Sequence, residues 1–284
     1  MRFSELMRSV ARSGDTWSVE VGEDWAQGRS LFGGLQGALA ARVMRDLLSI
    51  EAPLRSLQVA FLAPVPPGPV TLHARVLRTG KNVQQIEARI VAGDDTLCLA
   101  IGVYGAARAS RIGVLPTQPP VPAGALIAMP RLPGVVPENA PSMLPAPLRL
   151  PYVPGLTPNF TQHFAARWLH GSLPLSGSSE THQVLELDLL DPGGDPLDET
   201  HVLAFADFIP PIALNFLTTP ANGSSLSWMV EFLRDRYDDL APDGWRVHAD
   251  LLAARDGYLN QSVSLWAPDG TPAAIGRQAM TVFG

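Results

Sequence analysis

The chain has 284 residues, of which 46% are hydrophobic and 17% are charged, and this composition argues against a wholly disordered protein. The formal charge of −6 argues against the basic surface that nucleic-acid binding needs. The single cysteine, Cys98, excludes an intramolecular disulfide and a metal cluster held by several cysteines. At about 150 residues per domain, the length predicts two units.

The N-terminal twelve residues predict a short amphipathic helix rather than a targeting segment. Phe3, Leu6, Met7 and Val10 share one helical face, and charged residues interrupt the apolar run that a signal peptide needs. The longest uncharged stretch, 112–130, contains five prolines and therefore makes a poor membrane-spanning helix. We expect a cytoplasmic protein with no membrane insertion.

The first hundred residues predict one strand, a central helix and then an antiparallel meander. Residues 33–48 carry apolar side chains at helical spacing with small residues between them, which predicts a buried helix. Apolar and polar residues alternate in five segments, which predict strands: 17–21, 57–61, 70–76, 86–90 and 97–103.

Prolines then concentrate in one part of the chain. Thirteen of the 27 prolines lie between Arg111 and Pro158. Helices cannot run through such a segment and interior strands tolerate it badly. We therefore expect an extended connector over 109–158, between an N-terminal unit at 1–108 and a C-terminal unit at 159–284.

The order of elements returns after the connector. Residues 201–216 occupy the helix position, where Pro210 and Pro211 must kink or end the first part, and 191–195 predict a turn. Further strands are predicted at 160–168, 184–190, 225–233, 245–254, 258–265 and 273–283. Because elements recur after roughly 170 positions, we expect a duplicated α+β unit whose two sheets pair edge to edge.

This order of elements resembles the hotdog fold, and four motifs narrow the resemblance. The first leads through Phe32 into Gly33 and Gly34 at the start of the central helix. The others contain Asp207, Ser225 and Gln278, and the four motifs lie at residues 25–34, 203–208, 225–232 and 274–279. Together they resemble the acyl-CoA thioesterase II-like family. The resemblance implies an α+β double hotdog, in which two tandem units form one continuous sheet around central helices.

The resemblance also implies the residues of the site. Asp207 and Gln278 take the positions of the family's catalytic aspartate and glutamine, and Ser225 stands where the family has threonine. The aspartate–histidine pair that follows this threonine is replaced by Ser227 and Trp228, so Ser224 and Ser227 are alternatives for the hydroxyl.

Gly33 and Gly34 are expected to stabilise an oxyanion or bind substrate at the helix N-terminus, where free N–H groups and the helix dipole favour negative charge. The structural alternative for this pair is a simple turn from strand to helix. For Asp207 the structural alternative is a helix-capping or otherwise paired carboxylate.

The implied activity is hydrolysis of an acyl-CoA thioester, with water attack assisted by Asp207 and with no metal or organic cofactor. The alternative is a non-catalytic protein that binds acyl-CoA or lipid on the same fold. Hotdog hydratases carry a histidine five residues after the aspartate, whereas Ile212 stands there. The six histidines lack metal-ligand spacing, and the turn at 78–82 either contacts a CoA phosphate or is simply solvated. Exposed sheet edges and the resemblance favour a homo-oligomer, a dimer or larger.

Overall fold

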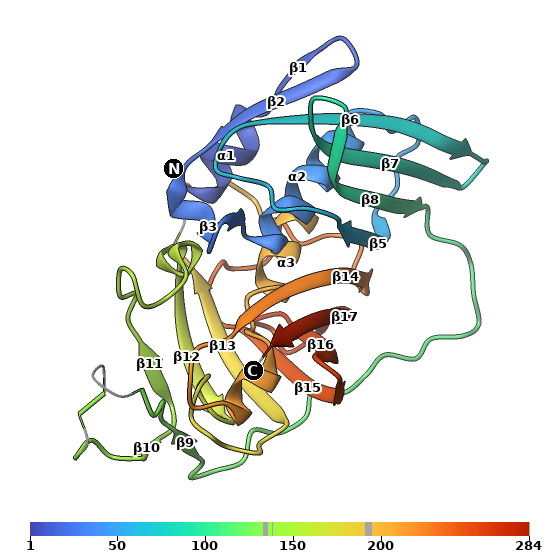
Figure 1. Cartoon of the computed structure of the whole chain (residues 1–284). Coiled ribbons are helices and arrows are strands. Elements are labelled where there is room, and N and C mark those ends of the chain that lie inside the picture. The colour runs from blue at the N-terminus through green and yellow to red at the C-terminus, as the bar shows by residue number, and fades with distance from the viewer. Residues whose placement is uncertain (133–135, 138, 191–194, 284) are drawn as a thin grey trace.

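The computed structural model describes residues 1–132, 136–137, 139–190 and 195–283. Thirteen of its strands form one antiparallel sheet, in the order β1-β2-β6-β7-β8-β5-β14-β17-β16-β15-β13-β12-β11 (Figure 1). The N-terminal half of the chain builds one side of this sheet and the C-terminal half builds the other. The predicted double hotdog with one continuous sheet is confirmed.

In the N-terminal half, the first helix packs its apolar face against the core as predicted. The elements are α1 (Phe3–Ser9), β1 (Ala11–Ser13), β2 (Thr16–Val21), η1 (Glu23–Trp25), β3 (Ala26–Gln27), β4 (Ser30–Leu31), α2 (Gly33–Arg45), β5 (Leu54–Phe61), β6 (Gly68–Thr79), β7 (Val83–Ala92) and β8 (Asp95–Gly105). Buried and exposed residues alternate along β2, as its sequence pattern predicts.

The C-terminal half repeats this arrangement in the same spatial order. Its elements are η2 (Asn159–His163), β12 (Phe164–His170), β13 (His182–Leu189), α3 (Glu199–Ala206), η3 (Ile212–Phe216), β14 (Asn222–Phe232), β15 (Trp245–Arg255), β16 (Tyr258–Trp266) and β17 (Pro272–Phe283). The neighbours β2-β6-β7-β8-β5 of the first half correspond to β13-β15-β16-β17-β14 of the second. The predicted duplication is therefore visible in the topology.

The two halves meet where β5 pairs with β14 in the middle of the sheet. Val59 lies opposite Trp228 and Leu57 lies opposite Val230 in this antiparallel ladder. Each half would expose an unpaired strand edge here without the other. The edge-to-edge pairing that we expected from the duplication is confirmed.

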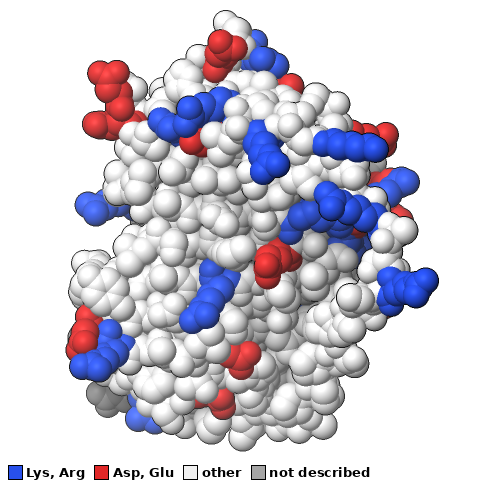
Figure 2. Space-filling view, turned by 90° about the vertical axis from the view of Figure 1, so that its right-hand side faces the viewer, with Lys and Arg blue, Asp and Glu red and all other residues white. Residues whose placement is uncertain are grey.

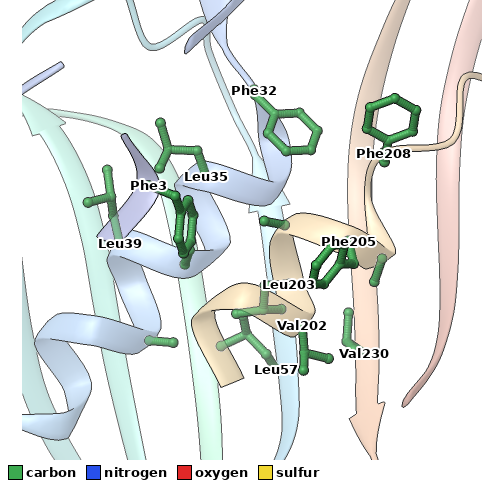
Figure 3. Packing of buried hydrophobic residues seen from close by; sticks show 14 of the residues in the cluster. Phe3, Phe32, Leu35, Leu39, Leu57, Val202, Leu203, Phe205, Phe208 and Val230 are labelled. Carbon is green, nitrogen blue, oxygen red and sulfur yellow. The ribbon is translucent and has the colours of Figure 1, made fainter. Parts of the chain in front are cut away.

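Helices α2 and α3 pack side by side on one face of the sheet, which we call the inner face (Figure 3). They run antiparallel, because Gly34 at the start of α2 lies against Leu203 near the end of α3, while Arg45 at the end of α2 pairs with Glu199 at the start of α3. A Cβ at Gly34 would lie 3.0 Å from the Leu203 carbonyl oxygen, so glycine permits the close crossing. The core around the helices draws residues from both halves.

Both helices are shorter than the segments predicted for them. The first ends at Arg45 rather than at residue 48, because the amides of Leu47 and Leu48 bond to carbonyls three residues back and tighten the last turn. In the second segment α3 covers Glu199–Ala206 and η3 follows after Pro210 and Pro211. The prolines separate the two pieces, as predicted.

The segment 109–158 contains three short strands that its prolines did not suggest: β9 (Leu126–Ala128), β10 (Met143–Pro145) and β11 (Leu148–Leu150). The strand β11 forms the outer edge of the main sheet, a position that tolerates flanking prolines. Of the predicted turn at 191–195, residues 191–194 lie outside the described part of the chain.

Charged side chains are spread thinly over the face of the molecule that Figure 2 shows. Blue and red groups lie there in small sets, separated by neutral residues. This fits a sequence in which only 17% of the residues are charged.

Candidate active site

Asp207 stands where the two helices meet, directly after the last residue of α3. The helix runs from Glu199 to Ala206, and its N-cap residue Asp198 accepts a hydrogen bond of 2.9 Å from the Thr200 amide. Asp207 adopts φ −97° and ψ 0°, so its side chain leaves the helix at its C-terminal end. That position directs it toward the N-terminus of α2 in the other half of the chain.

The N-terminus of α2 has no side-chain cap of its own, because Phe32 occupies the N-cap position. The Asp207 carboxylate lies at this place instead: a Cβ at Gly33 would be 2.6 Å from Asp207 Oδ2. Free N–H groups and the positive end of the helix dipole face an acid there. The structure thus brings together Asp207, Gly33 and Gly34, which the sequence analysis selected from separate halves.

Burial raises the pKa of Asp207 to about 7. A hydrogen bond from Gln278 Nε2 to Asp207 Oδ1 and the backbone N–H of Gly34 act in the opposite direction, because both favour the charged carboxylate. A carboxyl that titrates near neutral pH can accept or release a proton under ordinary conditions.

Gln278 lies on the inner face of β17, in a row of three buried side chains that crosses the sheet. Trp228 of β14 is its partner on one side and Gln261 of β16 is its partner on the other. Gln261 Oε1 accepts a hydrogen bond of 2.9 Å from the Ile212 amide and so fixes the start of η3. Gln278, which bonds Asp207, therefore lies beside Gln261, which bonds the first residue of η3. The helical turn η3 is the segment that follows Asp207 in the chain.

Ser225 reaches the inner face through an irregularity in β14. Ser227 pairs with Ala279 and Ser225 pairs with Met280, so Leu226 is an extra residue between them. This bulge reverses the alternation of side chains, and Ser225 therefore points to the same face as Trp228. Ser225 is half-buried, whereas Ser224 and Ser227 are exposed.

The register makes Ser225 a diagonal neighbour of Gln278, because its partner Met280 is two residues from Gln278 on β17. Such neighbours have Cα atoms about 7–8 Å apart. The structure therefore brings Ser225 to the region of Asp207 and Gln278, although within the described residues the side chain that bonds Asp207 is that of Gln278 rather than that of Ser225.

Trp228 shapes the site in a way that the sequence pattern does not reveal. Its indole lies between two glycines: a Cβ at Gly37 would be 3.1 Å from Cζ3, and a Cβ at Gly276 would be 3.3 Å from Nε1. Trp228 is almost fully buried, and its Nε1 has no hydrogen-bond partner among the described residues. No local signal could have revealed this packing, because the three residues belong to three separate elements.

Within the described residues, no group of three or more His, Cys, Asp or Glu side chains is placed to hold a metal ion. In that same part of the chain, no helix combines the length and the hydropathy needed to cross a membrane.

Comparison with known structures gives full-length matches. A conserved hot dog fold protein from Alicyclobacillus acidocaldarius superimposes with a TM-score of 0.81 at 19% identity, covering 100% of this chain and 99% of that one. A TesB protein from Mycobacterium avium subs paratuberculosis gives 0.73 at 12%, covering 100% of both. An acyl-CoA thioesterase II from Mycobacterium marinum gives 0.65 at 14%, covering 98% and 97%. These likenesses show the fold.

The family is shown by the sequence itself. Residues 21–105 match the acyl-CoA thioesterase N-terminal domain, and residues 137–282 match the acyl-CoA thioesterase C-terminal domain. No curated protein matches the sequence. Since the two domain matches together cover most of the chain, this protein belongs to the acyl-CoA thioesterase family and is a thioester hydrolase built as a double hotdog.

Proposed function

We propose that this protein hydrolyses acyl-CoA thioesters with Asp207 as the general base. The observation that carries the proposal is the Asp207 carboxyl itself, which has a pKa raised to about 7 and lies at the uncapped N-terminus of α2. A water molecule activated by this carboxylate attacks the thioester carbonyl carbon, and Asp207 takes the proton from the water.

The other groups have roles that their positions support. Gln278 donates to Oδ1 and keeps the carboxylate oriented, while the Ser225 hydroxyl holds the attacking water. The backbone N–H groups of Gly33 and Gly34, the second of which also bonds Asp207, stabilise the negative charge that forms on the thioester oxygen. When the C–S bond breaks, Asp207 returns its proton to the departing CoA thiolate.

The decisive experiment replaces Asp207 with asparagine and measures acyl-CoA hydrolysis through release of free CoA. Asp207→Asn keeps the shape of the side chain and removes the base, so kcat falls by at least a hundredfold. Asp250→Asn is the matched control, because Asp250 is an exposed carboxylate on β15 that pairs with His182. Its activity stays at the wild-type level.

The alternative of a non-catalytic protein that binds acyl-CoA or lipid gives a different result. Such a protein releases no CoA from any acyl-CoA, and Asp207→Asn then changes nothing in turnover. The hydratase alternative is disfavoured, because Ile212 occupies the position of the second catalytic group and is fully buried.

The proposal also includes an acyl-CoA substrate in lipid metabolism, a cytoplasmic location and self-association as a dimer or larger. Support for self-association comes from the short strands β1 and β11, which leave both outer edges of the sheet without a neighbour among the described residues. Light scattering on the purified full chain measures the oligomeric state.

A further inference from the structure

A groove of about 310 Å³ opens in the C-terminal half, between η3 and the ends of β15, β16 and β17. Its walls are apolar: Ala213 and Phe216 come from η3, and Leu251, Leu259 and Val282 come from the three strands. Among the described residues that line it, only Arg255 is charged, and that side chain lies at the rim with 88% exposure.

Two connections join the groove to the proposed catalytic residues. Ala213 follows Asp207 by six residues, and the hydrogen bond from the Ile212 amide to Gln261 Oε1 holds η3 against β16. On β17 the groove residue Val282 is four positions beyond Gln278, a distance of about 14 Å along an extended strand.

Met280 lies on the inner face of β17, between Gln278 and the groove residue Val282. It pairs with Ser225 on one side and with the groove residue Leu259 on the other. Its unbranched thioether side chain can adjust to a ligand more easily than a branched one. Met280 thus stands between the proposed reaction centre and the groove.

On the side of Asp207 away from the groove, the Trp228 side chain fills the inner face. There the Trp228 indole lies between Gly37 of α2 and Gly276 of β17, and it leaves no room for even a methyl group on either glycine without a shift. An acyl chain that starts at Asp207 is therefore turned away from the space under α2.

We propose that the groove holds the acyl chain of the substrate, with Met280 between the thioester and the groove and Trp228 closing the other side. This inference rests on the proposed function. The apolar walls select a hydrocarbon chain rather than the charged CoA portion. A groove of this volume has room for several methylene groups. The substrate class is therefore medium-chain acyl-CoA.

Chain-length dependence is the measurable consequence. Each methylene that leaves water for an apolar wall improves binding about fourfold. Between butanoyl-CoA and decanoyl-CoA the wild-type kcat/KM therefore rises steeply, and palmitoyl-CoA gains nothing more because its chain exceeds the groove.

The test fills the groove from two walls separately. Ala213→Phe and Val282→Phe each add a ring to it, and Ala253→Phe adds the same ring on β15 at an exposed residue outside the lining. The ratio of kcat/KM for decanoyl-CoA to that for butanoyl-CoA falls on the order of tenfold in the two groove variants and stays unchanged in Ala253→Phe. Melting temperatures identify a groove variant that fails to fold. In that case the kcat/KM ratio of the other groove variant tests the assignment.

Binding of the thioethers S-decyl-CoA and S-butyl-CoA separates this inference from the proposed function, because neither can be hydrolysed. If no acyl-CoA is hydrolysed but S-decyl-CoA binds more tightly and Ala213→Phe removes the difference, the proposed function is wrong and the groove assignment stands. If both thioethers bind equally to the wild type, the groove assignment is wrong whatever the hydrolysis shows. Equal weakening of free CoA by Ala213→Phe also overturns it, since the groove then holds the CoA portion.

Discussion

Asp207 is held by groups from both halves of the chain, and this explains why its acidity is unusual. Burial between α2 and α3 disfavours its charge, while Gln278 from β17 and the Gly34 amide from α2 favour it. The net result is a pKa of about 7. An isolated aspartate is ionised from about pH 4 upward and is a weak base. Partners from both halves therefore help to set the pKa of one carboxyl in the range in which a general base is useful.

The pH dependence of hydrolysis follows from this value. Asp207 must be ionised to take a proton from water, so kcat/KM increases with pH and levels off above about pH 7. Below the pKa the rate falls about tenfold per pH unit, because the ionised fraction falls by that factor. Initial rates between pH 5 and pH 9 measure the profile, and a rate that stays constant over this range would contradict the raised pKa.

At the scale of elements, α2 and α3 are joined at both ends by groups of opposite charge. The Asp207 carboxylate lies at the N-terminus of α2, and at the other end Arg45 of α2 pairs with Glu199 of α3. The Arg45 guanidinium also lies 5.1 Å from the centre of the Tyr104 ring and donates a 3.0 Å hydrogen bond to the Ala52 carbonyl. The pair with Glu199 stabilises the antiparallel crossing that places Asp207, and the contacts with Tyr104 and Ala52 hold the Arg45 side chain in position.

The pair of Arg45 and Glu199 can be tested by a double-mutant cycle. Glu199 is nearly buried, so Arg45→Leu leaves a carboxylate without its cation and lowers the free energy of unfolding by about 2 kcal/mol. The double variant Arg45→Leu with Glu199→Leu recovers most of this loss, because neither charge is then left unpaired. Urea denaturation measures both values.

The neighbouring pair of Arg42 and Asp46 is the control for that cycle. It joins partly exposed side chains, Arg42 of α2 and Asp46 directly after the helix, and Arg42→Leu therefore costs about 0.5 kcal/mol or less. A loss in Arg45→Leu no larger than in Arg42→Leu would show that the pair with Glu199 does not join the helices.

At the scale of the whole molecule, the duplicated order of elements could be predicted because each strand and helix has its own periodic pattern of apolar residues. Alternation of period two marks the strands, and the small and apolar residues of 33–48 mark α2. Asp207 and Gln278 were found through their motifs, and the structure places them in contact.

What could not be predicted depends on partners far apart in the chain. The bulge at Leu226, which turns Ser225 rather than Ser224 or Ser227 inward, is defined only against β17. The position of Trp228 needs glycines from α2 and β17, and the strand β11 exists only because β12 offers it an edge. Sequence periods describe a strand by itself, whereas register is a property of two strands.

One continuous sheet and one shared core mean that the two halves should unfold together. The ladder between β5 and β14, the pair of Arg45 and Glu199, and the pair of Arg55 and Asp235 all cross the boundary between them. We therefore expect a single calorimetric transition whose measured enthalpy equals its van't Hoff enthalpy. Two independent domains would give two transitions instead.

Core substitutions placed one in each half make this test specific. Leu72 of β6 and Leu185 of β13 are both fully buried, and replacing either with alanine costs about 2–5 kcal/mol. In a cooperative molecule each variant lowers the denaturant midpoint of hydrogen exchange equally for peptides from both halves. If Leu72→Ala lowers the midpoint only for N-terminal peptides and Leu185→Ala only for C-terminal ones, the ladder between β5 and β14 does not couple the halves. The placement of Asp207 against Gly33 would then depend on the local contact of α2 with α3 alone.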